Sequence, residues 1–238
     1  MKFSKRKIII NSWNTLKNHL RLWIFIMLLI FGLNLFLGTI QDILLGKVTS
    51  QSILFTIAAS LFQMGLNLGM LRIALNINKT NKATLKDLIG SFHMLIPYVL
   101  ATIIFLFIML LAASPGIVLL FVSISSDWDT IATLDGLNAG TTFILALLII
   151  VPVIYVSIRL QFYDYFIIDN ECSILESIIN SAKITKGYIS ELFLLGAMLT
   201  IIVLISIVPL GAGLLISIPL GITVNTSVFR GLKTETKD

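Results

Sequence analysis

Residues 170–187 have the sequence NECSILESIINSAKITKG, and two long apolar runs, 189–209 and 213–229, follow them. Ser173 and Glu176 are spaced as a capping box, in which each side chain bonds the backbone N–H of the other residue at the start of a helix. This spacing predicts that a helix begins directly after Ser173.

The segment 173–186 has one apolar and one polar helical face. The apolar face holds Ile174, Leu175, Ile178, Ile179 and Ala182, and the polar face holds Glu176, Ser177, Asn180, Ser181 and Lys183. Lys186 suits the negative end of the helix dipole, and Gly187 is a common helix stop. We therefore expect 173–186 to be an amphipathic helix lying in the membrane interface.

The composition indicates a membrane protein. Of the 238 residues, 57% are hydrophobic and 12% charged, and the mean hydropathy is +1.01. The apolar residues are clustered in long runs rather than alternating, which is typical of transmembrane helices and not of barrel strands. Because the single cysteine, Cys172, has no partner in the chain, an intramolecular disulfide and a multi-cysteine metal site are excluded.

We predict an all-α membrane protein that forms one polytopic domain over residues 1–238. Its six transmembrane helices are expected at about 22–40, 52–75, 97–113, 141–160, 189–209 and 213–229. Two or three interfacial helices are expected on the cytoplasmic side, at 1–21, 84–95 and 173–186. Residues 117–123 are too short to cross alone, so they either extend the third helix or lie at the outer surface. The pair Gly65 and Gly69 predicts close approach of another segment, more simply from the same chain than from a second copy.

The basic residues predict the orientation. With both termini in the cytoplasm of a bacterium, only Lys47 of the 17 Lys and Arg residues lies outside, which leaves 16 at the inner face of the inner membrane. The acidic segment 125–140 then lies outside.

The second half of the chain resembles a known group of proteins. The helix ending in AKITKGY (182–188) is followed by an apolar run and then by VPLGAGLLISIPLG (208–221). This pattern is similar to uncharacterised bacterial integral membrane proteins related to the membrane region fused to some glycerophosphodiesterases. The resemblance covers about residues 60–230, best over 165–230, although Phe229 stands where that family has a Tyr. It implies six transmembrane helices with two interfacial helices, and no agreed activity.

The sequence gives no reason to expect catalysis, a metal or a cofactor. It lacks the HExxH, GxSxG, Walker and GxGxxG motifs. The candidate ligand-binding residues are the amides within the apolar runs: Gln63, Asn67, Asn34 and Asn225. They either line a cavity for a solute or lipid headgroup, or tie helices together by hydrogen bonds worth roughly 0.6–2 kcal/mol each.

Basic residues at the predicted inner face are the second set of candidates. Those expected to meet lipid headgroups are Lys5, Arg6, Lys7, Arg72, Arg159 and Arg230. We expect a non-catalytic membrane protein that responds to lipid or binds a partner at the inner leaflet. Its partners would be anionic lipid headgroups, with a membrane protein or a peptide as further candidates and no nucleic acid. The alternative is a transporter or channel for a small solute or a lipid, with a polar cavity near Gln63 and Asn67.

Overall fold

The computed structural model describes residues 4–45, 50–125, 139–170, 172–209 and 211–235. These residues form ten α-helices and a short 3₁₀ helix, Phe92–Met94, and contain no strand. The α-helices are α1 (Lys5–Asn18), α2 (Leu20–Leu45), α3 (Ser50–Thr80), α4 (Lys86–Ile89), α5 (Leu95–Ser125), α6 (Ala139–Leu160), α7 (Tyr163–Asn170), α8 (Ile174–Ile184), α9 (Ile189–Ile207) and α10 (Leu214–Glu235). Six helical segments are long and apolar enough to cross a membrane. The predicted all-α class with six such helices is therefore confirmed, and the fold is that of a multi-pass membrane protein.

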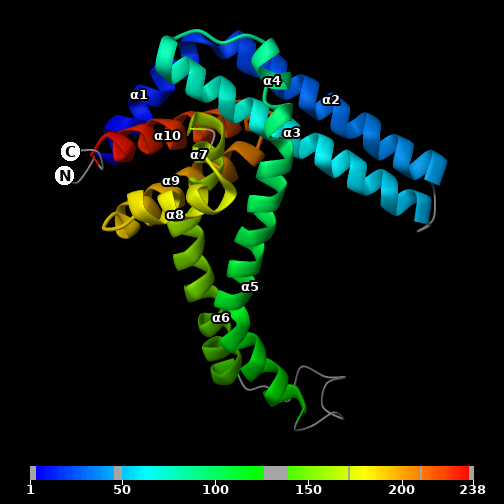
Figure 1. Cartoon of the computed structure of the whole chain (residues 1–238), viewed down its shortest axis with the longest axis vertical. Coiled ribbons are helices and arrows are strands. Elements are labelled where there is room, and N and C mark those ends of the chain that lie inside the picture. Colours follow the sequence, from blue (N-terminus) through cyan, green and yellow to red (C-terminus); the bar gives the residue numbers. More distant parts are fainter. Residues whose placement is uncertain (1–3, 46–49, 126–138, 171, 210, 236–238) are drawn as a thin grey trace.

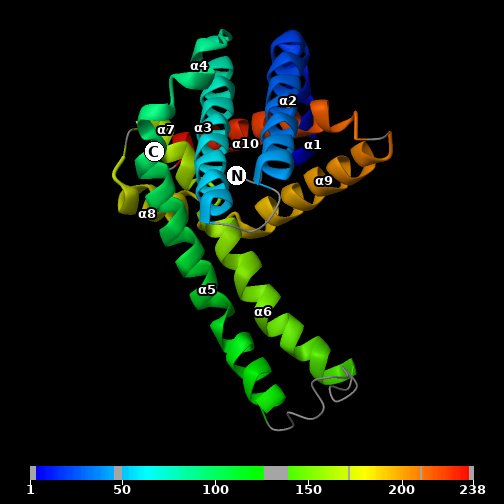
Figure 2. The ribbon, with the colours of Figure 1, turned by 90° about the vertical axis from the view of Figure 1, so that its right-hand side faces the viewer.

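The six long helices form three hairpins, α2/α3, α5/α6 and α9/α10, that diverge from a common base (Figures 1 and 2). The base consists of α1, α4, α7, α8 and the ends of the long helices that adjoin them. In Figure 1 the α2/α3 hairpin extends to the right and the α5/α6 hairpin downward, while Figure 2 shows α9/α10 extending to the right. Helix α10 packs against α2 and α3, whereas most of α2, α5, α6 and α9 is not buried inside the protein.

Large apolar side chains cover these diverging hairpins. Phe36 on α2, Leu54 on α3 and Phe107 on α5 are 62%, 67% and 59% exposed. An apolar surface of this extent is unfavourable in water, whereas in a bilayer it contacts acyl chains at no such cost. The outer surface of the hairpins is therefore suited to lipid.

The core of the base is an aromatic cluster that joins α7 to α10. Phe229 is fully buried, and its ring centroid lies 5.9 Å from that of Phe162, 5.3 Å from that of Tyr165 and 5.0 Å from that of Phe166. Aromatic pairs at such distances contribute about 0.5–1.5 kcal/mol each beyond their buried area. Trp23 at the start of α2 is buried in the same core, so the α2/α3 and α9/α10 hairpins share one packed centre. The α5/α6 hairpin packs against α7 and α8 in a second buried cluster, which includes Ala101, Leu160 and Ile178.

The predicted role of the glycine pair on α3 is confirmed within the chain. A Cβ atom on Gly69 would lie 2.0 Å from the carbonyl oxygen of Leu88, and one on Gly65 would lie 2.6 Å from the Phe92 ring. Both contacts are shorter than van der Waals distances permit. The two glycines thus let the segment between α3 and α5 lie directly on α3.

That connecting segment differs from the prediction. We expected one helix over 84–95, but only Lys86–Ile89 is α-helical, and the 3₁₀ turn Phe92–Met94 follows Gly90. The Arg72 guanidinium donates a hydrogen bond of 2.9 Å to the Gly90 carbonyl. This long-range bond replaces the one that the carbonyl would accept inside a continuous helix.

Helix α5 is longer than the predicted span 97–113 and passes through Pro115 without ending. Proline has no N–H, so the Leu111 carbonyl four residues earlier loses its usual helical donor. The Ser114 hydroxyl supplies the missing hydrogen bond to Leu111, over 2.8 Å. Of the two alternatives left open for residues 117–123, the structure shows the first: they extend the third helix.

Candidate functional site at the base

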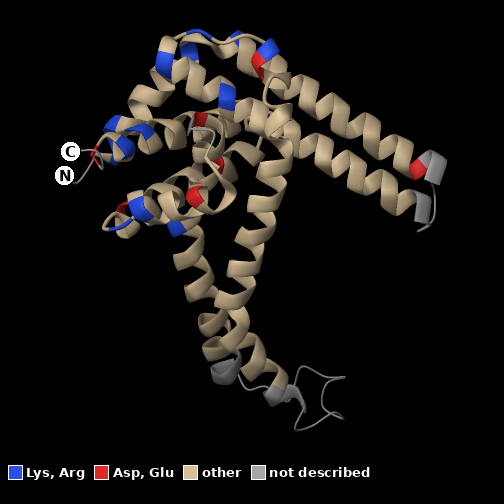
Figure 3. Cartoon of the chain, in the orientation of Figure 1, with Lys and Arg blue, Asp and Glu red and all other residues tan. Residues whose placement is uncertain are grey.

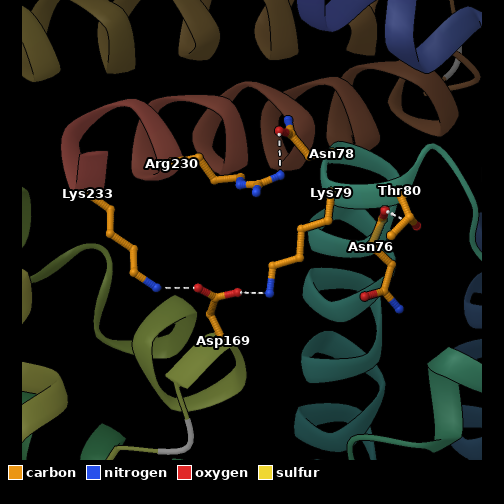
Figure 4. Close-up of polar contacts among 7 residues, drawn as sticks. All are labelled: Asn76, Asn78, Lys79, Thr80, Asp169, Arg230 and Lys233. Atoms are coloured by element: carbon orange, nitrogen blue, oxygen red, sulfur yellow. Dashed lines mark hydrogen bonds and ion pairs between the residues drawn. The ribbon is translucent and has the colours of Figure 1, made fainter. Parts of the chain in front are cut away.

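The polar centre of the base is a carboxylate that joins all three hairpins. Asp169 lies in the last turn of α7, and its side chain is only 7% exposed. One carboxylate oxygen forms an ion pair with Lys79 near the end of α3, and the other lies 2.5 Å from the ammonium of Lys233 on α10 (Figure 4). Because a buried charge is costly without a partner, this pairing favours the arrangement in which α3, α7 and α10 meet.

A network of neutral polar groups extends from this ion cluster to α1. The Asn78 amide donates to the Ser227 hydroxyl over 3.0 Å, and Ser227 lies 3.2 Å from the hydroxyl of buried Ser12. The Arg230 guanidinium donates to the Asn78 carbonyl oxygen over 3.4 Å (Figure 4). The N-terminal helix is therefore held against α10 by specific hydrogen bonds as well as by apolar packing.

Among the side chains drawn in Figure 4, Lys79, Arg230 and Lys233 are cationic and Asp169 is anionic. The ammonium of Lys233 lies 5.6 Å from the Phe229 ring centroid, a cation–π contact that partly offsets its desolvation. No described acidic side chain forms an ion pair with Arg230.

A polar hollow of about 470 Å³ opens beside the cluster, between α1 and the end of α3. Its lining residues are Thr15, Ile77, Asn78, Lys79, Thr80 and Asn81. Asn81 has a φ of 54°, the left-handed conformation in which asparagine often ends a helix, and its N–H donates back to the Ile77 carbonyl. This cap turns the chain at the wall of the hollow, where Asn81 Oδ1 lies 3.0 Å from the Nε2 atom of His19.

A second polar site holds α8 against the break between α6 and α7. The Ser181 hydroxyl accepts a hydrogen bond from the Phe162 N–H over 3.0 Å and donates to the Arg159 carbonyl over 3.2 Å. The Thr185 hydroxyl lies 2.9 Å from the same carbonyl. These bonds satisfy backbone groups that the end of α6 leaves without helical partners.

The capping box predicted for this helix is present. The Ser173 N–H donates to the Glu176 carboxylate over 3.2 Å. Hydrogen bonds from the Ser173 hydroxyl and from its N–H lower the pKa of Glu176.

The buried face of α8 agrees only in part with the prediction, since Ile178 is buried and Ile174 and Ala182 pack against its cluster as expected. Ser177 and Ser181 are fully buried, whereas Leu175 and Ile179 from the predicted apolar face are 62% and 51% exposed. Small hydroxyl side chains allow close packing on the α6–α7 break and supply its hydrogen bonds, so they occupy the inner face. The exposed leucine and isoleucine point away from the protein, toward the predicted interface.

All of the basic residues proposed for the inner face lie at the base (Figure 3). Lys5, Arg6 and Lys7 begin α1, and Arg6 and Lys7 are exposed. Arg159 and Arg230 are half-buried, on α6 and α10 respectively. Arg72 is half-buried on α3 and bonds the connecting segment described above.

The amides predicted within the membrane are not gathered into one cavity. The Gln63 amide on α3 donates to Asn34 on α2 over 2.8 Å, and Asn34 also donates to the Ile30 carbonyl over 3.0 Å. Asn67 is exposed, and Asn225 is half-buried on α10. A mainly apolar hollow of about 420 Å³ between α2 and α10 has Asn34 at its wall, and neither Gln63 nor Asn67 lines it.

The ion cluster contains residues that the sequence analysis did not select. Asp169, Lys79 and Lys233 were passed over, and Arg230 alone was named. The available signal was positional, because all four residues follow the predicted inner ends of three long apolar runs: Lys79 follows 52–75, Asp169 follows 141–160, and Arg230 and Lys233 follow 213–229. Which of these ends meet depends on tertiary packing.

Comparisons with known proteins give one result. Neither the curated proteins nor the solved structures contain a match to this chain. A protein-family comparison matches residues 3–235, nearly the whole chain. The chain therefore belongs to the family described as "Protein of unknown function (DUF975)".

Proposed function

We propose that this protein is a non-catalytic component of the bacterial cytoplasmic membrane whose base binds anionic lipid headgroups at the inner leaflet. The observation that carries the proposal is the gathering of Lys and Arg residues at the base, the shared end of all three hairpins (Figure 3). Basic residues of multi-pass proteins concentrate on the cytoplasmic side and attract anionic lipids over about 10 Å. On this proposal both chain termini are cytoplasmic.

Two short helices of the base support a contact with lipid. On α8, Leu175 and Ile179 are exposed close to Lys183, and on α4 Ile89 is 68% exposed close to Lys86. A helix that lies in the interface inserts such apolar side chains among acyl chains and keeps its lysines among headgroups. We propose that α1, α4 and α8 are the interfacial elements of the protein.

An acidic peptide or a membrane protein would also suit a positive surface. Lipid is the better-supported partner, because the exposed apolar side chains beside the lysines match the layered chemistry of a leaflet. We also propose that this chain is related to the membrane region fused to some glycerophosphodiesterases, as its sequence pattern predicts.

The transporter alternative has less support. It needs a water-filled path at Gln63 and Asn67, but the Gln63 amide is bonded to Asn34. The hollow between α2 and α10 and the one between α6 and α9 are lined mainly by apolar side chains. We propose that Gln63 and Asn34 tie the first hairpin together.

The test replaces Lys5, Arg6 and Lys7 together by Gln in the purified full-length protein. Each basic residue near an anionic surface contributes about 1 kcal/mol, so affinity for dioctanoyl phosphatidylglycerol should fall by up to about 100-fold. The remaining binding should depend less on salt concentration. Native mass spectrometry across a lipid titration would measure the change.

A matched control changes Asn11, Asn14 and Asn18 on the same helix to Gln, which leaves the charge unaltered and should leave lipid binding unchanged. If the basic triple variant binds the anionic lipid as the wild type does, the proposed function is wrong. A loss of solute uptake in Gln63→Leu with Asn67→Leu, with no loss in the basic triple variant, would favour the transporter instead.

A further inference from the structure

We infer that the groove between α6 and α9 holds one acyl chain of an anionic phospholipid whose phosphate lies at the base. This inference rests on the proposed function and assigns a specific site to it. The groove has a volume of about 530 Å³, and its walls include Val151, Ile154, Tyr155 and Ile158 on α6 and Ile189 and Phe193 on α9.

The first argument is the chemistry of the walls. They are mainly apolar, and Val151, Tyr155 and Phe193 are each more than half exposed, so no described part of the chain covers the groove. Helices α6 and α9 belong to different hairpins and diverge from the base (Figure 2). An apolar groove that opens between two membrane helices is filled in a bilayer by acyl chains, which gain from each methylene group that they bury.

The second argument is the charge at the end of the groove nearest the base. Val151, Tyr155 and Arg159 are spaced by four residues, so Arg159 continues the groove-lining face of α6 by one turn. No described acidic side chain forms an ion pair with Arg159. On the other wall, Ile189 and Ser190 are the first two residues of α9, so the positive end of that helix adjoins the groove. Both features attract a phosphate group.

One acidic residue lies close to this end. The Ser190 hydroxyl donates to the Glu191 carboxylate over 2.9 Å, and Glu191 is buried and does not line the groove. This carboxylate is therefore already bonded within the protein. An exposed lysine, Lys186, directly precedes Gly187, which lines the groove.

The third argument is size and position. A volume of about 530 Å³ lies within the range of 300–1,000 Å³ typical of small-molecule sites. Ile158 is two residues from the end of α6, and Ile189 begins α9, so the groove starts at the base and runs along the hairpins. If the base faces the inner leaflet, Tyr155 lies near the headgroup boundary, where tyrosine is enriched, and the acyl chain extends from there into the hydrocarbon.

The test compares Val151→Trp with Ile150→Trp in the purified full-length protein. Both residues are exposed on α6, but Ile150 does not line the groove. Because the indole would occupy the space of the acyl chain, Val151→Trp should weaken binding of palmitoyl-oleoyl phosphatidylglycerol about five- to tenfold, and Ile150→Trp should change it less than about twofold. Native mass spectrometry across a lipid titration measures both, and equal effects would overturn the site.

Arg159→Gln tests the position of the phosphate. The Ser181 and Thr185 hydroxyls contact the Arg159 carbonyl and not its side chain, so this variant keeps those contacts. Phosphatidylglycerol binding should fall about fivefold, whereas phosphatidylcholine binding should change less than about twofold. Arg21→Gln removes the same charge from the start of α2, away from the groove, and should change neither by more than about twofold. Equal losses of the two lipids in Arg159→Gln, or equal effects of the two arginine variants, would overturn the inference.

A crosslinking experiment on the wild type does not depend on how any variant folds. Phosphatidylglycerol with a diazirine in one acyl chain, added in detergent at an equimolar ratio, should crosslink to residues 151–158 and 189–193, and excess unlabelled phosphatidylglycerol should abolish these crosslinks. Crosslinks on other helices alone would overturn the site. A dimer in the mass spectra that Val151→Trp dissociates would assign the groove to a second copy of the chain, which would also overturn it.

The same measurements separate this inference from the proposed function. If the Lys5, Arg6 and Lys7 variant loses phosphatidylglycerol while Val151→Trp and Arg159→Gln do not, the proposed function stands and this site falls. If the two groove variants lose it while the basic triple variant does not, the groove stands and the basic start of α1 is not where lipid binds. If the wild type does not prefer phosphatidylglycerol to phosphatidylcholine, both fail.

Discussion

At the scale of the residue, Gly69 shows how a single methyl group decides whether two segments can pack. In Gly69→Ala the new Cβ would meet the Leu88 carbonyl oxygen at 2.0 Å, and a backbone atom cannot move aside as a flexible side chain can. We expect the substitution to lower the free energy of unfolding by about 1–3 kcal/mol. The thermal unfolding midpoint, measured in detergent, should fall accordingly. Gly196→Ala on α9 is the control, because nothing lies within 4 Å of its Cβ. A control variant as unstable as Gly69→Ala would contradict this account.

Single-residue features were predictable from the sequence where their partners are close along the chain. The capping box of Ser173 and Glu176 follows from a spacing of three residues, and the structure contains it. Asp169 gave no such signal, because Lys233 is 64 residues away and Lys79 lies on another hairpin. Only the packing of α3, α7 and α10 brings these charges together.

At the scale of the element, α8 acts as a clamp on the break between α6 and α7. Ser181→Ala would remove the acceptor of the buried Phe162 N–H, and an unsatisfied buried donor costs about 1–3 kcal/mol. We expect a lower thermal unfolding midpoint in the full-length protein. Ser60→Ala on α3 is the control, because that exposed hydroxyl donates to the Thr56 carbonyl of its own helix. This variant should change the free energy of unfolding by less than about 0.5 kcal/mol. Equal unfolding midpoints for the two variants would show that the Ser181 hydroxyl does not stabilise the break between α6 and α7.

The existence of α8 and the burial of Ile178 could be predicted from sequence, but the burial of its serines could not. A pattern argument assigns serine to the outer face and isoleucine to the inner face. Here Ser177 and Ser181 are fully buried because their small hydroxyl side chains fit the α6–α7 break, and Ile179 is half-exposed because lipid is a suitable environment for it. Helix α7 itself was not predicted, since its eight residues follow the long apolar run of α6 without a cap or a proline.

At the scale of the whole molecule, the run lengths of apolar residues predict how many helices cross the membrane, but not how they are arranged. Helices α2, α3, α6, α9 and α10 all begin within two residues of the predicted starts. The divergence of the three hairpins has no counterpart in the sequence, because in lipid the apolar surface does not drive helices together. Polar contacts at the base select the arrangement instead, and Asp169 is the group that contacts helices of all three hairpins or their direct extensions.

If the base is the cytoplasmic end of every hairpin, all three hairpin tips lie on the other side of the membrane. The natural Cys172 is first replaced by Ser, and single cysteines are then placed at Thr49, Thr130 and Ala212 for the tips and at Lys82 for the base. Thr49 and Thr130 lie outside the described residues, in the chain between α2 and α3 and between α5 and α6, and Ala212 is in the turn between α9 and α10. A membrane-impermeant thiol reagent added to intact cells should label the three tip variants, and it should label the Lys82 variant only after permeabilisation.

Labelling of the base in intact cells, with protected tips, would reverse the orientation and move the proposed lipid site to the outer leaflet. A tip that differs from the other two would show that the hairpins do not cross in parallel, and the shared base could not then lie at one surface.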